Sequence, residues 1–61
     1  MSKQSILHRA QYAKEFGASI SNPGVVGAAS AIIAMCGDKS ITAEKIIVSE
    51  AYAIVNRVYS R

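Results

Sequence analysis

The chain has 61 residues, 51% of them hydrophobic, and a formal net charge of +3 from seven Lys or Arg and four Asp or Glu. This length allows one domain, and the apolar content excludes the polar, highly charged profile of a disordered tail. The charge is small and the cations are spread along the chain, so a nucleic-acid or acidic partner is permitted but not indicated.

The first predicted helix covers about residues 3–16, because its apolar side chains recur at helical spacing. Ile6, Ala10 and Ala13 form an i, i+4, i+7 stripe. Tyr12 and Phe16 extend this stripe on one side. The stripe predicts one buried face, and the glycine that follows is well placed just past a helix end.

The second predicted helix covers residues 23–36 and carries no charge. Asn22 can accept hydrogen bonds from free backbone N–H groups at its start, and Pro23 loses nothing at the first helical position. A helix that is apolar all round is normally buried on several sides, so we expect this one at the centre of the assembly. Small residues recur four apart, which lets another helix approach closely: Gly24 with Ala28, and Gly27 with Ala31.

The third predicted helix covers residues 43–60 and has the widest apolar face. Thr42 can cap it, and Ile41 can pack on Ile46 as a hydrophobic staple. At 100° per residue the apolar side chains fill an arc of roughly 160°, whereas packing on one layer needs a stripe of about 100° or slightly more. The arc contains Ile47, Val48, Ala51, Tyr52, Ile54, Val55, Val58 and Tyr59.

This surplus of apolar surface predicts self-association. Small chains usually gain stability from disulfides, a metal ion or oligomerisation, and Cys36 has no partner cysteine. Tyr and Arg are enriched where interfaces concentrate binding energy. The predicted protein interface comprises Val48, Tyr52, Val55 and Tyr59, with Arg57 and Arg61 at its rim. In the alternative, a three-helix monomer covers both edges of the arc and the tyrosine hydroxyls reach water.

No combination of residues predicts catalysis. His8 lies on the polar side of the first helix, and Glu15, the acid roughly on the same face, is two turns away. Cys36 ends a helix, where the helix dipole opposes ionisation of a thiol. One Cys and one His cannot supply a usual tetrahedral metal shell. We therefore expect no enzymatic activity, no catalytic residue, no cofactor and no metal.

Two other functions remain open from the sequence. The second and third helices resemble the outline of a DNA-binding helix-turn-helix, but residues 43–47 offer few groups for base edges. The connection over residues 37–41 is also longer than usual. A small membrane-associated protein is the second alternative, although residues 23–36 would reach only about 21 Å across a core of roughly 30 Å.

The sequence therefore predicts an all-α protein: a small three-helix domain over residues 1–61 that forms a homodimer or small oligomer. We expect a non-catalytic protein-binding module that acts as inhibitor, adaptor or assembly subunit on a larger protein. The first ten residues show no apolar h-region behind a basic start, and a lone cysteine fits a reducing compartment. A cytoplasmic location is the expectation that follows.

Overall fold

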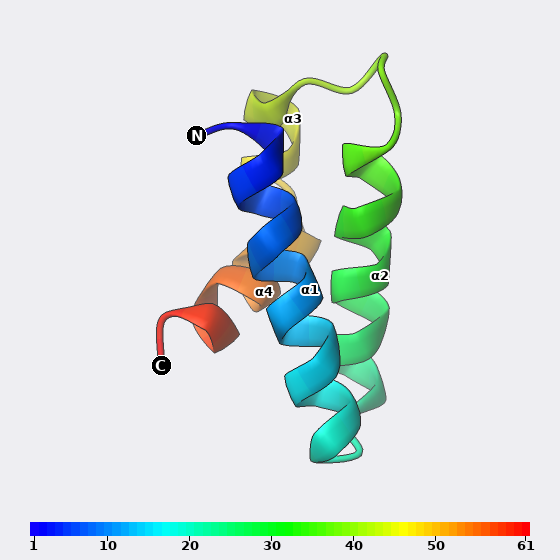
Figure 1. Cartoon of the computed structure of the whole chain (residues 1–61), viewed down its shortest axis with the longest axis vertical. Coiled ribbons are helices and arrows are strands. Elements are labelled where there is room, and N and C mark those ends of the chain that lie inside the picture. The colour runs from blue at the N-terminus through cyan, green and yellow to red at the C-terminus, as the bar shows by residue number, and fades with distance from the viewer.

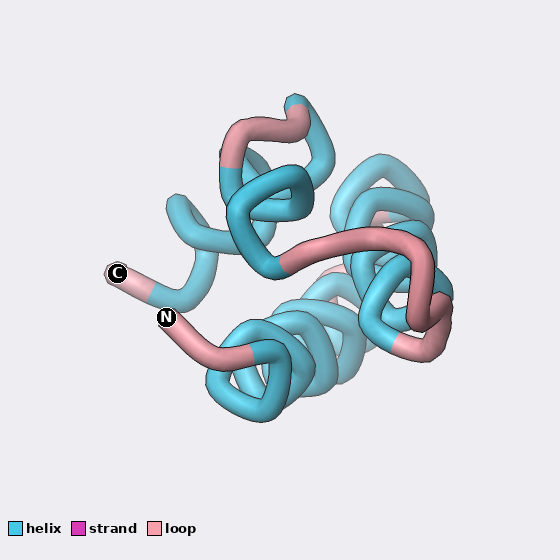
Figure 2. Tube along the Cα trace, turned by 90° about the horizontal axis from the view of Figure 1, so that it is seen from above, coloured by secondary structure: helices cyan, strands magenta, loops and turns pink.

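Four helices account for 75% of the chain and no strand is present, which confirms the all-α class predicted from the sequence. The computed structural model describes all 61 residues, Met1–Arg61. The helices are α1 (Lys3–Ser19), α2 (Pro23–Cys36), α3 (Ala43–Ile47) and α4 (Glu50–Tyr59) (Figure 1). α1 and α2 lie antiparallel and side by side, and α3 with α4 forms the third corner of a triangle seen from above (Figure 2).

Each helix begins after a polar side chain that accepts a hydrogen bond from a backbone N–H of the first turn. The oxygen-to-nitrogen distances are 3.2 or 3.3 Å at all four starts. Such caps satisfy N–H groups that have no partner within the helix. The capping residues are Ser2, Asn22, Thr42 and Ser49.

The core is a single cluster of apolar side chains between the three layers of helix. On α1, the expected stripe of Ile6, Ala10 and Ala13 is fully buried. Its small alanines let the neighbouring helices pack closely on α1. The remaining core residues come from α2, α3 and α4: Val25, Ala29, Ile32, Ile46, Tyr52, Val55 and Val58.

α1 continues past residue 16 to Ser19, because Gly17 does not end it. Gly17 is buried inside the helix, and a Cβ built on it would lie 2.8 Å from Val25 Cγ1 and 3.1 Å from Val26 Cγ2. The helix gives way to a short turn in which Ser21 takes a left-handed φ of 54°. The glycine therefore serves close packing of α1 on α2, whereas the sequence had suggested a helix end.

The third expected helix is divided into two, which gives four helices where the sequence predicted three. α3 ends at Ile47 and α4 begins at Glu50. Between them, the Ser49 hydroxyl donates to the Ile46 carbonyl oxygen at 2.6 Å and accepts from the Tyr52 N–H at 3.2 Å. A serine side chain that bonds nearby backbone groups competes with the helical hydrogen bonds, and here it starts a new helix. We call the segment Ile47–Ser49 the elbow.

The elbow changes how much of the predicted apolar arc is exposed to solvent. Because α4 takes a direction of its own, it turns Tyr52, Val55 and Val58 toward α1 and α2. The bend lets two neighbouring helices cover side chains that the sequence assigned to a partner.

By its overall dimensions, the single chain resembles an ordinary folded monomer. Its radius of gyration of 10.4 Å matches the ~10.5 Å expected for a compact chain of this length. Its accessible surface is 3929 Å², close to the ~3,800 Å² typical of a folded monomer of 6.5 kDa. The total accessible surface of the chain therefore does not exceed that of a folded monomer of the same mass. A binding surface must instead be located from the positions of the exposed apolar side chains.

Candidate protein-binding surface

The residues predicted to form the interface do not share one surface. Two of them belong to the core of the single chain, since Val55 is fully buried and Tyr52 is 6% exposed. The Tyr52 hydroxyl also has a partner within the chain, the Met1 sulfur at 3.2 Å. The sequence placed these two residues at an interface between chains, whereas the structure places them in the core of one chain, where the bend at the elbow brings them.

The other four predicted residues remain accessible, but in different places. Val48 is 81% exposed at the elbow. Arg57 lies exposed on the outer side of α4. Tyr59 is half-buried against α1, and Arg61 lies with its guanidinium carbon 5.6 Å above the ring of Phe16.

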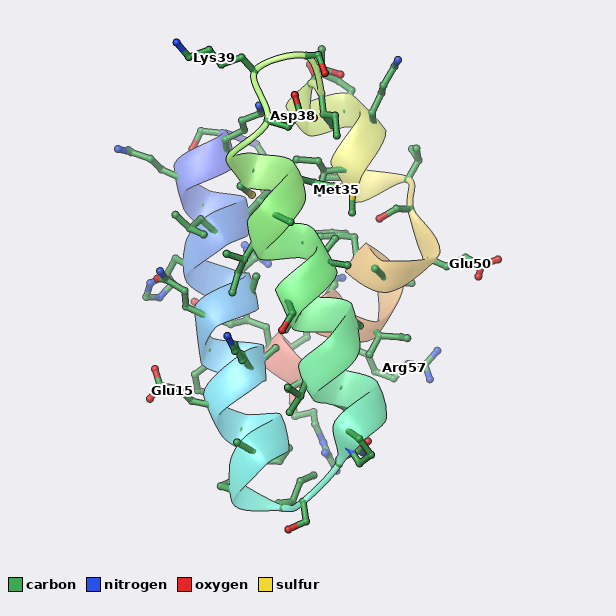
Figure 3. The ribbon with its side chains drawn as sticks, turned by 90° about the vertical axis from the view of Figure 1, so that its right-hand side faces the viewer. Glu15, Met35, Asp38, Lys39, Glu50 and Arg57 are labelled. Carbon is green, nitrogen blue, oxygen red and sulfur yellow. The ribbon has the colours of Figure 1, made fainter.

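The most continuous uncharged surface lies on α2. The sequence predicted burial of this helix on several sides. Val25, Ala29 and Ile32 are buried, six further residues are half-buried, and one side of the helix stays exposed. With only α1 and the α3–α4 pair to cover it, the side of α2 away from the core faces solvent (Figure 3). The exposed helical positions on that side are Gly24, Gly27, Ala31 and Ala34, spaced i, i+3, i+7 and i+10.

Ile54 of α4 extends this surface with a large side chain. It is 39% exposed. On α4, Ile54 lies about 160° around the helix from Asn56, counting 100° per residue. Asn56 accepts a hydrogen bond from Arg9 of α1, so Ile54 is on the edge of α4 that is turned away from α1 and toward α2. We call Gly24, Gly27, Ala31, Ala34 and Ile54 the α2 face.

The labelled charged side chains lie on the neighbouring helices, outside the α2 face. In Figure 3, Glu15 projects from the side of α1 that is away from α2, and Glu50 and Arg57 project from the α4 side. All three are exposed. The surface thus has an apolar centre and a polar margin, the arrangement found in protein–protein interfaces.

The groups considered for chemistry lie apart. The His8 ring packs edge-to-face on Tyr59, with centroids 6.0 Å apart. Burial raises the pKa of the Cys36 thiol above its ordinary value of 9.0, although the charge of Lys3 opposes this effect. The structure contains no cavity and no cluster of three metal-ligating side chains. Nothing in this geometry places a nucleophile next to a base.

The structure also bears on the two alternative functions. The helix that would serve as the recognition helix of a helix-turn-helix is α3, which has only five residues before the elbow. Among the helices, none combines the length and the apolarity that a membrane crossing needs.

The sequence did not indicate a second surface, where α1 meets the last turn of α4. There Arg9, Tyr12 and Phe16 from α1 contact Tyr59 and Arg61. The aromatic spacing on α1 was visible in the sequence. Its contact with residues 59–61 depends on the direction that the elbow gives to α4, which the sequence did not reveal.

Comparison of the chain with protein-family models, curated proteins and solved structures gives no match. Function is therefore inferred from the residues of these two surfaces.

Proposed function

We propose that the chain is a non-catalytic protein-binding module whose first partner is a second copy of itself, bound through the α2 face. The observation that carries the proposal is an exposed side of α2, made of glycine and alanine, on a helix that carries no charged side chain. Continuous apolar surface of this kind on a small protein marks an interaction site.

The shape of the α2 face suits a second copy. Gly27 has no neighbouring atom within 4 Å of a Cβ built on it, so the space above α2 is open to a partner. Small residues allow helices to approach to the low end of the usual 8–10 Å interaxial range. Ile54 supplies a large side chain beside these small ones. A two-fold pair requires a surface that complements itself, and large beside small side chains meet this requirement.

A pair of standard size would use more of the chain than α2 alone. A standard interface buries ~800 Å² on each partner, which is about a fifth of the 3929 Å² of this chain. α2 runs along the longest dimension of the molecule, 32 Å, next to a width of 19 Å (Figure 1). The contact would therefore extend along the whole long side of the molecule, with Arg57 at its margin.

The test is the oligomeric state of a matched pair of variants, measured by sedimentation equilibrium. Ala31→Glu puts a charge at the centre of the α2 face, whereas Ala53→Glu puts the same charge on an exposed position of α4 outside it. We expect the natural chain and Ala53→Glu to dimerise with rising concentration, and Ala31→Glu to stay monomeric. A natural chain that is monomeric up to about 1 mM, where an association of about −4 kcal/mol is half complete, would refute the proposal.

Beyond the pair, we propose that the elbow engages a larger protein, for which the chain acts as inhibitor, adaptor or assembly subunit. Val48 supports this role because its side chain is 81% exposed at the elbow, where a partner could cover it. A partner recovered with the natural chain and with Ala31→Glu, but lost with Val48→Ser, would separate this contact from self-association. We assign the module to the cytoplasm, where the free thiol of Cys36 remains reduced.

A further inference from the structure

We propose that the seam between α1 and α4 binds single-stranded nucleic acid through a cluster of two arginines and three aromatic rings. We call Arg9, Tyr12, Phe16, Tyr59 and Arg61 the arginine–aromatic cluster. This binding is independent of the self-association proposed for the α2 face, since the two surfaces share no residue.

The five side chains form one unbroken series of contacts. The Arg61 guanidinium carbon lies 5.6 Å above the centroid of Phe16, and the rings of Phe16 and Tyr12 lie 6.4 Å apart with their planes 9° from parallel. Tyr12 then meets Tyr59 edge-to-face at 5.5 Å. The Arg9 guanidinium carbon closes the series 4.8 Å above the ring of Tyr59. The seam therefore holds three rings in a row with a cation at each end.

The polar groups of this series can still bind an anion. A guanidinium that lies over a ring uses its flat side for that contact and keeps its N–H donors at its edge. Arg9 gives one of them to Asn56 Oδ1 at 3.3 Å, and does not pair with a carboxylate. Arg61 is exposed and stays within reach of a phosphate beside the rings.

The rings offer a surface for stacking. Tyr12 is 48% exposed, a large fraction for an aromatic side chain that already has two aromatic neighbours. Nucleobases stack on exposed rings whatever their sequence, while the backbone follows nearby positive charge. A duplex hides the faces of its bases, and an acidic peptide has no bases. A single strand is the one partner that uses both the rings and the cations.

The distribution of acidic residues favours the same partner. Of the four carboxylates, Glu15 alone lies on α1, one turn from Tyr12. Asp38 lies in the connection after α2, Glu44 in α3, and Glu50 at the start of α4. Among side chains, the seam therefore holds two arginines against one acidic residue at its border. Neutralising that carboxylate with Glu15→Gln should strengthen binding.

The probe is a fluorescein-labelled oligothymidylate of about twelve nucleotides, enough to cover one small site. Fluorescence anisotropy at rising salt should give a slope of log K against log salt near −1.4, because two phosphates contribute about −0.7 each. Arg61→Gln should reduce the slope to about −0.7. Lys39→Gln removes the same charge from the exposed connection after α2, far from the seam, and should leave the slope unchanged (Figure 3).

Tyr12→Leu tests the stacking contribution. It keeps an apolar side chain and should weaken binding by about fivefold or more, while thermal melting followed by circular dichroism reports whether the fold is intact. Three results would overturn the proposal: no binding at low salt, equal losses for Arg61→Gln and Lys39→Gln, or equally tight binding of a poly-glutamate peptide. The last would assign the seam to acidic proteins instead.

Discussion

Replacing Gly17 with alanine tests the closest contact between α1 and α2. The added methyl group would lie 2.8 Å from Val25 Cγ1 and 3.0 Å from Val25 Cβ, distances at which something must move. Val25 is a buried, β-branched residue within α2, so its side chain has few other rotamers to adopt. We therefore expect α1 and α2 to be pushed apart.

The size of the effect follows from two opposing contributions. Alanine favours a helix over glycine by about 1 kcal/mol, and this gain applies at any helix interior. Overpacking a filled core costs about 1–3 kcal/mol. Gly27→Ala makes the same exchange within α2, where no atom lies within 4 Å of the new Cβ. The difference between the two variants therefore isolates the overlap at Gly17, about 1–3 kcal/mol.

The assay is urea unfolding followed by circular dichroism, at a chain concentration low enough to keep the protein monomeric. We expect Gly27→Ala to exceed the natural chain in stability and Gly17→Ala to fall below Gly27→Ala by the amount of the overlap. In thermal melting, each kcal/mol corresponds to about 4–8 °C in a domain of this size. If Gly17→Ala stabilised the chain as much as Gly27→Ala does, α1 and α2 would not be in the contact described.

Three further predictions concern α3, the elbow and the loop before α3. Ile46→Val should cost about 0.5–1.5 kcal/mol and its exposed neighbour Ile47→Val less than about 0.5 kcal/mol, and equal losses in urea unfolding would place α3 in a different register. Ser49→Ala removes both elbow hydrogen bonds and should cost about 1 kcal/mol; an unchanged urea midpoint would show that the elbow does not depend on them. The Ser40 hydroxyl and N–H hold the pKa of Asp38 below its ordinary 3.8. The stability that this carboxylate contributes is therefore complete above about pH 4 and lost as the pH falls through the lowered pKa. Asp38→Ala should be less stable than the natural chain near neutral pH, and the two should converge in acid; a constant gap across pH would contradict this.

Local signals in the sequence were enough to predict most of the helical structure. Asn22 and Pro23 begin a helix because one accepts from free N–H groups and the other needs no hydrogen bond there. The stripe of Ile6, Ala10 and Ala13 is buried because residues at that spacing share one side of a helix. These effects act within one or two turns and do not depend on the rest of the fold.

The elbow was not predicted, because two local tendencies compete there. The apolar spacing over residues 43–60 favours one long helix, whereas Ser49 followed by Glu50 is a typical helix start. In the structure a new helix starts at Ser49, and Val55 and Tyr52 are then buried against α1 and α2. Whether residues 43–60 form one helix or two depends on packing against segments that are distant in the sequence. The spacing of apolar residues within one segment does not reveal such packing.

The same bend accompanies the burial, within one chain, of two of the six residues predicted at the interface. Spacing along residues 43–60 alone gave Tyr52 and Val55 no neighbour within the chain, so they were predicted as partner contacts. With the bend, the exposed apolar surface moves to the α2 face, and the last turn of α4 meets α1 to build the arginine–aromatic cluster. Both surfaces depend on how helices are arranged in space.

Isotope-filtered NMR on an equal mixture of ¹³C-labelled and unlabelled chains tests the central claim most directly, since it detects only contacts between copies. We expect contacts between copies that involve the methyl groups of Ala31, Ala34 and Ile54. A spectrum at about 1 mM with no contact between copies, or with contacts only from residues outside the α2 face, would contradict self-association through that face.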